Sequence, residues 1–170
     1  MPRAIRVLKQ ADRAGRPLAD TLILNYAQRS AQRVSVTGVK GGAYEIALRE
    51  PTRLLTDDLV EMDDGRLVEI VAAPEPVIEV RAADLAGLAR LAWQLGDRHV
   101  PVQVLANRIR VQRDKTVETL LNSLGAKVTM IEAPFDPEGG AYASSHVHEH
   151  SHAHDHSHDH GHAHRHHHER

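Results

Sequence analysis

The last 25 residues of the chain have a composition that cannot build a packed domain. From His146 to His166 every second residue is histidine and two more follow, so 13 of the 14 histidines lie in this stretch. The residues between them are mostly Ser, Ala, Asp, Gly and Glu, and no large apolar side chain is present to offset the entropy of ordering. We therefore expect residues 143–170 to form a disordered tail, and the fold to be confined to what precedes it.

Short β-rich runs occupy the first part of the chain. Turn residues separate the four runs, which read TLILNY, RVSVTG, AYEIALRE and RLVEIVA. Asp63-Asp64-Gly65 is a candidate hairpin turn, because glycine tolerates the positive φ that such turns need. We predict a small all-β domain over residues 1–73. Two prolines within three positions then predict a short, stiff linker over residues 74–76.

The pattern changes after this linker to strands that alternate with amphipathic helices. Asp84 and Asp114 are candidate N-caps of two helices with apolar residues at helical spacing, and Gly96 and Gly125 are candidate stops. The expected strands cover residues 77–82, 102–106, 108–111 and 127–133. This β-α-β-β-α-β order is the ferredoxin-like arrangement, over residues 77–142. The chain is thus predicted to be an α+β protein, and the thin core of so small a unit favours a homodimer.

Composition excludes several classes of protein. The chain has no cysteine, so it has neither a disulfide framework nor a thiolate metal site. No apolar run approaches the roughly 18 residues of a membrane span, and the N-terminus has no signal-peptide core. A formal net charge of −2 without a basic stripe argues against a nucleic-acid binder. We expect a cytoplasmic protein with no membrane or nucleic-acid partner.

The tail has the composition of a metal-binding tract. Neutral imidazole is a good ligand for nickel, copper and zinc, and the tract is interrupted, unlike an expression tag. At roughly two to four imidazoles per ion, the tail would hold about three to six ions, with high capacity and poor selectivity. The candidate ligands are His146, His148, His150, His152, His154, His156, His158, His160, His162, His164, His166, His167 and His168.

His99 is the single histidine outside the tail. A lone histidine just past a helix is commonly structural, bonding a neighbour or capping carbonyls. As a metal ligand it would need help, which a two-fold dimer supplies by bringing two copies together, and tail histidines could complete the coordination. Asp97 and Gln103 are nearby polar residues that could orient the ring. Both interpretations stay open at this point.

Two motifs resemble those of the UreE family of urease accessory nickel metallochaperones. GDRHVPVQV, which contains His99, is similar to the family motif GNRHxxxQ, and EAPFDPEGGAY (residues 132–142) is similar to PFxPExGAY. The two-domain order and the histidine-rich tail also match, so the resemblance covers nearly the whole chain. It implies a cytoplasmic homodimer that binds nickel through His99 of both protomers at their interface, with zinc or copper as competitors. It also implies delivery to apo-urease together with the accessory GTPase and other urease maturation proteins, and a first domain of peptide-binding type.

The sequence departs from the family pattern in two places. Asp97 replaces the asparagine of the motif, which adds negative charge beside the expected metal. Residues 110–115, RVQRDK, lack the extra histidines that some relatives carry there, so no second internal site is expected.

Two other functions compete with the metallochaperone. A histidine-rich storage or buffering protein without a client is the alternative that the tail alone would also fit. An enzyme is not expected, because the chain lacks a GxxxxGK[ST] phosphate loop and a catalytic grouping around His99.

Overall fold

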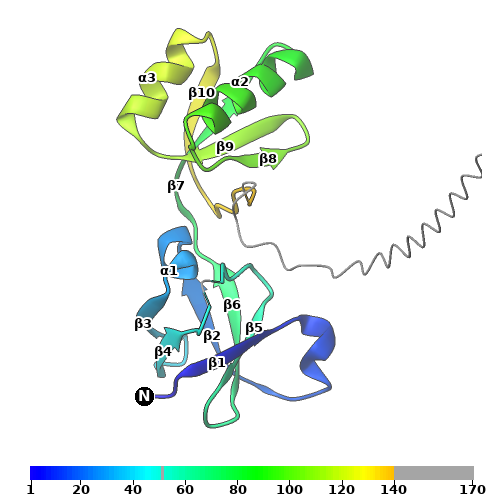
Figure 1. Cartoon of the computed structure of the whole chain (residues 1–170), viewed down its shortest axis with the longest axis vertical. Helices are drawn as coiled ribbons and strands as arrows, with labels where there is room; N and C mark the ends of the chain where they lie inside the picture. Colours follow the sequence, from blue (N-terminus) through cyan, green and yellow to red (C-terminus); the bar gives the residue numbers. More distant parts are fainter. Residues whose placement is uncertain (51, 140–170) are drawn as a thin grey trace, which may run out of the picture.

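A computed structural model describes residues 1–50 and 52–139 (Figure 1). The predicted tail, with its thirteen histidines, lies outside the described residues. Two structural units follow one another along the chain, a β-rich unit and then an α/β unit, as the sequence predicted. In the described part, no helix is long and apolar enough to cross a membrane.

The N-terminal unit consists of a four-stranded sheet, in the order β1-β5-β6-β2, and a separate β3–β4 hairpin. The predicted hairpin turn is confirmed, because β5 and β6 are antiparallel and Gly65 has a φ of 81°. Two short helical turns also belong to this unit. The elements are β1 (Ala4–Leu8), η1 (Gln10–Arg13), β2 (Leu18–Leu24), α1 (Tyr26–Ser30), β3 (Arg33–Thr37), β4 (Ala43–Ala47), β5 (Leu59–Met62) and β6 (Leu67–Ala72).

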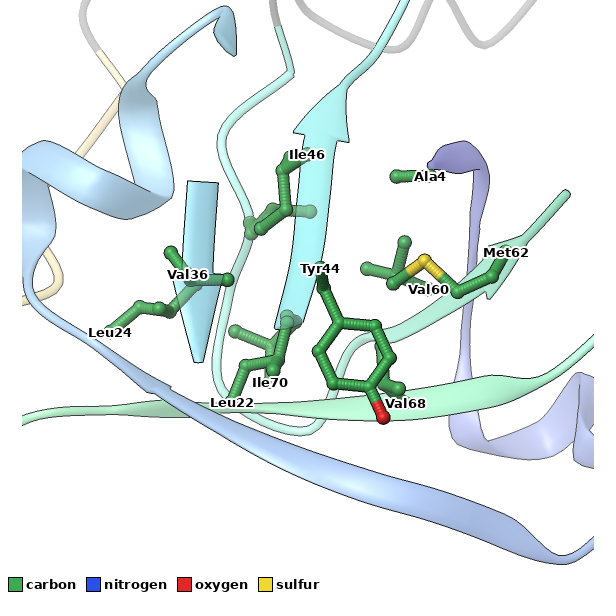
Figure 2. Close-up of a cluster of buried hydrophobic side chains, with 11 residues drawn as sticks. Ala4, Leu22, Leu24, Val36, Tyr44, Ile46, Val60, Met62, Val68 and Ile70 are labelled. Atoms are coloured by element: carbon green, nitrogen blue, oxygen red, sulfur yellow. The ribbon is translucent and has the colours of Figure 1, made fainter. Parts of the chain in front are cut away.

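The core of this unit joins the sheet to the hairpin. Figure 2 shows Tyr44 and Ile46 from β4 in one cluster with Val68 and Ile70 from β6. All four side chains are buried, and they alternate along their strands with more exposed residues or with residues on the other face. The sequence therefore builds this core from aliphatic side chains, one methionine and one tyrosine.

The C-terminal unit has the predicted ferredoxin-like order. Its antiparallel sheet runs β10-β7-β9-β8. As predicted, the side chains of Asp84 and Asp114 cap the two helices, accepting from Gly87 N and Val117 N. The elements are β7 (Glu75–Arg81), α2 (Leu85–Asp97), β8 (Gln103–Leu105), β9 (Arg108–Gln112), α3 (Lys115–Ser123) and β10 (Lys127–Ala133). β7 thus begins inside the span that was predicted to be linker.

Both helices cover the same face of this sheet. Leu91 and Leu95 of α2 and Leu121 of α3 form one buried cluster with the even-numbered β7 residues Ile78 and Val80. Because strand side chains alternate, the odd-numbered residues of β7 lie on the opposite, open face. The face under the helices is thus apolar, and the other face carries both the apolar Val77, which packs with Phe135, and the polar Glu79 and Arg81.

A segment beyond β10 connects the two units. Phe135 is fully buried and packs edge-to-face on Tyr26 of α1, with ring centroids 5.4 Å apart. Arg29 of α1, which has no exposed surface, donates to the carbonyl oxygen of Phe135 at 2.6 Å and pairs with Asp136. In Figure 1 this gold segment lies between the two units. The contacts fix the position of the chain just before the tail begins.

Candidate metal centre

His99 lies where α2 turns back toward the sheet. Its backbone N–H donates to the carbonyl oxygen of Gly96 at 2.9 Å, and Val100 N–H donates to that of Leu95 at 3.0 Å. These paired bonds are the Schellman motif that commonly ends a helix. Gly96 was predicted to be the stop, and that was wrong. The helix continues to Asp97, and His99 takes the left-handed position after it, with φ of 56°.

The second helix ends in the same way with a different residue. Gly125 N–H donates to the carbonyl oxygen of Asn122, and Ala126 N–H donates to that of Leu121, both at 3.1 Å. Gly125 has a φ of 73°. Glycine is the usual residue at this position because it has no Cβ to oppose a positive φ. His99 has that Cβ, and a left-handed non-glycine residue costs about 1–2 kcal/mol. The fold thus tolerates strain in order to place an imidazole at the end of α2.

The His99 side chain is exposed. In the residues that the structure describes, its ring makes no hydrogen bond, and only its backbone N–H takes part in the helix end. A structural histidine would be expected to bond a neighbour or to cap carbonyl oxygens with its ring. The geometry therefore favours a histidine whose ring is free to bind a ligand over a histidine with a structural role.

The two predicted orienting residues lie on either side of His99 along the chain. Asp97 is exposed in the last turn of α2. Gln103 opens β8, and its amide Oε1 is buried without a hydrogen-bond partner among the described residues. Neither bonds to His99 within those residues. A buried amide oxygen without a donor is costly, so Gln103 Oε1 is an unpaired acceptor inside the described part.

One copy of the described chain does not contain a complete metal site. Residues 1–50 and 52–139 hold no group of three or more His, Asp or Glu side chains close enough to share an ion. His99 would therefore need ligands from elsewhere, either from a second copy or from the thirteen predicted tail histidines, His146 to His168. The structure does not bring these residues together, because the tail lies outside the described part.

The segment after β10 leads the chain toward His99. Glu138 N–H donates to the carbonyl oxygen of Val102 at 2.8 Å, and Val104 N–H donates to Oε1 of Glu138 at 3.3 Å. The described chain then ends one residue later, beside the strand that follows the His99 loop.

Sequence reasoning missed Arg29, which holds the start of this segment, because a lone arginine in a short polar helix gives no signal of burial.

Comparisons with known proteins agree with this two-unit architecture. The family model for the UreE urease accessory protein N-terminal domain matches residues 3–73, and the model for its C-terminal domain matches residues 75–169. The chain therefore belongs to the UreE urease accessory protein family.

Three curated relatives, each called urease accessory protein UreE, show how far the likeness extends. The Rhodopseudomonas palustris HaA2 protein is 47% identical over 130 residues, covering 76% of this chain and 60% of the relative. The Bradyrhizobium ORS 278 protein is 47% identical over 149 residues, with 87% and 70% covered. The Bradyrhizobium BTAi1 protein is 49% identical over 143 residues, with 84% and 69% covered. The matched part therefore spans between three-fifths and about seven-tenths of these relatives.

Proposed function

We propose that this chain is a nickel-binding metallochaperone that delivers nickel to apo-urease while the urease active site is assembled. The observation that carries the proposal is His99, whose exposed ring stands at a left-handed position where the fold favours glycine. Membership of the UreE family supports the same function. Strained residues concentrate at functional sites, where the strain is offset by the rest of the fold.

The metal site that we propose is shared between two protomers. A two-fold axis beside His99 would supply two imidazoles that hold one ion without the tail, and tail histidines would add further ligands to that ion in the full chain. Nickel is the cargo, and zinc and copper compete for the same nitrogen ligands. On this proposal the protein works in the cytoplasm as a homodimer, with the urease accessory GTPase and other maturation proteins as partners. It carries out no catalysis of its own.

A storage or buffering protein is the second candidate, because the tail composition alone would serve either function. A protein without a client should bind metal through its tail, and His99 should contribute nothing. A client-directed chaperone should copurify with urease maturation proteins from cells grown with nickel. Recovery of the chain alone, under conditions in which urease is being activated, would favour storage.

A metal titration of the full chain and of a truncation after Ser145 tests the proposal. We expect the truncated protein to lose most of the bound ions and to keep about one tight nickel site per dimer. Copper and zinc are titrated in parallel, because imidazole sites bind them as well. Equal numbers of ions on both proteins would contradict the role of the tail, and a truncated protein without a tight site would contradict the role of His99.

A further inference from the structure

The open face of the ferredoxin-like sheet gathers positive charge. Four side chains, which we call the basic face, lie in two neighbouring rows that run across the strands: Arg81, Arg108, Arg110 and Lys127. These two rows, one through Glu79 and one through Arg81, are called the upper rows. Lys127 of β10 is paired with Arg81 of β7, and Arg110 of β9 is paired with Glu79 of β7. Because paired residues share a side of the sheet, all of them project from the face opposite the helices.

A single carboxylate lies among these four cations. Oxygens of Glu79 lie 3.0 Å from Arg81 Nη2, 3.0 Å from Arg108 Nε and 3.3 Å from Arg110 Nη2. Burial acts to raise the pKa of Glu79, but the three arginines outweigh it and hold the pKa below its usual value. Glu79 is therefore ionised at neutral pH, and the basic face keeps a net charge of about +3. Lys127 is exposed, and the exposed fraction of the side chain is 42% for Arg81, 32% for Arg108 and 16% for Arg110, so Lys127 and Arg81 present most of this charge to solvent.

None of the hydrophobic clusters in the described part includes a residue of the basic face. The helices pack on the other side of the sheet, and the contact with the N-terminal unit involves Val77 and Ile131, one row below Glu79. The upper rows also carry Thr129, Gln103 and Leu105, and no aromatic residue is among them. Single-stranded nucleic acid is usually held on such sheets by stacking on aromatic rings. The face therefore suits an acidic polypeptide better than a nucleic acid.

The chain itself contains a segment of the complementary charge. Residues 146–160 include the carboxylates of Glu149, Asp155 and Asp159 and no lysine or arginine, which gives a charge of −3 when the histidines are neutral. The described chain ends just after Glu138, which is bonded to Val102 and Val104 at the β8 edge of this same sheet. The residues between 139 and 146 can span roughly 24 Å. Crossing the four strands needs only about 14 Å.

We propose that residues 146–160, when free of metal, dock on the basic face of their own chain, and that metal loading releases them. The release step rests on the proposed function, since it requires the tail to bind metal. Each divalent ion adds two positive charges, so two ions change the segment from −3 to +1. The attraction to the basic face then becomes repulsion, and the loaded tail is freed to present its cargo. Tethering keeps even a weak contact occupied, because the segment cannot diffuse away.

A spin label on the tail tests this contact directly. The chain has no cysteine, so Ser157→Cys introduces one attachment site for a nitroxide within the acidic segment. In the full-length metal-free protein, we expect the label to broaden the amide resonances of Arg81, Arg110 and Thr129 strongly. Resonances of the outer sides of α2 and α3 should be spared. Zinc, which is diamagnetic, should restore the broadened resonances, and so should about 1 M salt, at which the Debye length is only about 3 Å.

The matched control removes the charge of the tail and keeps every histidine. Glu149→Gln, Asp155→Asn and Asp159→Asn in one chain should abolish the broadening and leave the number of zinc ions per chain unchanged in equilibrium dialysis. Persistent broadening in this variant, or broadening spread evenly over the molecule, would overturn the proposal. So would broadening that appears equally when spin-labelled chains are mixed with separate isotope-labelled chains, because the tail would then be docking on another copy.

The two proposals can fail separately. If dialysis shows that the tail takes up no zinc, the proposed function and the release step both fail, while the metal-free contact is still decided by the broadening. If zinc is taken up and the metal-free protein shows no broadening on the basic face, the docking is refuted and the proposed function stands.

Discussion

Replacing His99 with glycine should make the metal-free protein more stable. The left-handed backbone at φ of 56° costs a residue with a Cβ about 1–2 kcal/mol, and glycine removes that cost. Glycine also gains freedom in the unfolded chain, which takes back about 0.4–1 kcal/mol. The ring itself is exposed and makes no hydrogen bond in the described part, so its loss should cost little. We expect His99→Gly to raise the free energy of unfolding by about 0.5–1 kcal/mol.

Two matched variants separate backbone strain from side-chain contacts. His99→Ala keeps the Cβ and removes the ring, so its stability should stay within about 0.5 kcal/mol of wild type. Gly125→Ala introduces a Cβ at the equivalent end of α3, where φ is 73° and no atom lies within 4 Å of the new carbon. Its effect should therefore be purely conformational, a loss of about 0.5–1 kcal/mol.

Urea unfolding followed by far-ultraviolet circular dichroism, with a chelator present, measures all three changes. The transition midpoint should move and the dependence on urea should stay constant, because the exposed surface of the native state is unchanged. If both His99→Gly and His99→Ala lowered the stability by more than about 1 kcal/mol, the ring would be making native contacts. His99 would then be a structural residue, and the strain would not be a sign of function.

Three further predictions concern the N-terminal unit and the tail. Arg29→Met should lower the free energy of unfolding by about 3 kcal/mol in the same urea assay, because the substitution leaves Asp136 and the Phe135 carbonyl oxygen without their buried partner. A loss of stability below about 1 kcal/mol would contradict this prediction. Hydrogen bonds from Arg6 and Arg16 lower the pKa of Glu61 in the folded protein from its usual 4.5. The stability that ionised Glu61 contributes is therefore complete above about pH 4.5, and it is lost as the pH falls through the lower pKa of the folded protein. Glu61→Gln should therefore reduce the fall in unfolding midpoint between about pH 5 and pH 3, and an unchanged slope would refute the assignment. Nickel loading of the full chain, measured by dialysis, should fall sharply from about pH 7.5 to about pH 5.5 as the tail imidazoles become protonated, whereas undiminished loading would indicate carboxylate ligands.

The sequence was sufficient for the order of elements in the C-terminal unit. Local signals decide that order: Asp84 and Asp114 cap their helices, and the apolar residues that follow have helical spacing. β1 was missed because it lies in a short stretch whose strand state depends on pairing with β5, about 55 residues away. Such non-local pairing leaves little trace in a five-residue run.

The candidate site was only partly predictable. His99 was identified by its rarity and its motif, but the left-handed backbone could not be read from the sequence, where Gly96 looked like the natural helix stop. The Schellman geometry instead follows from how Val100 returns to the sheet and bonds Leu95. Arg29 gave no signal, because its burial is created by Phe135 and Asp136, more than a hundred residues away.

Isothermal titration of nickel into the metal-free chain truncated after Ser145 tests the central claim most directly, with wild type compared to His99→Gly. We predict tight binding of about one ion per two chains in the wild type, and no tight binding in the variant, even though the variant is the more stable protein. The free energy of unfolding would then rise while tight nickel binding is lost. This combination is expected only if His99 is a strained residue that binds the metal. Equal tight binding by both proteins would contradict the account and remove His99 from the metal site.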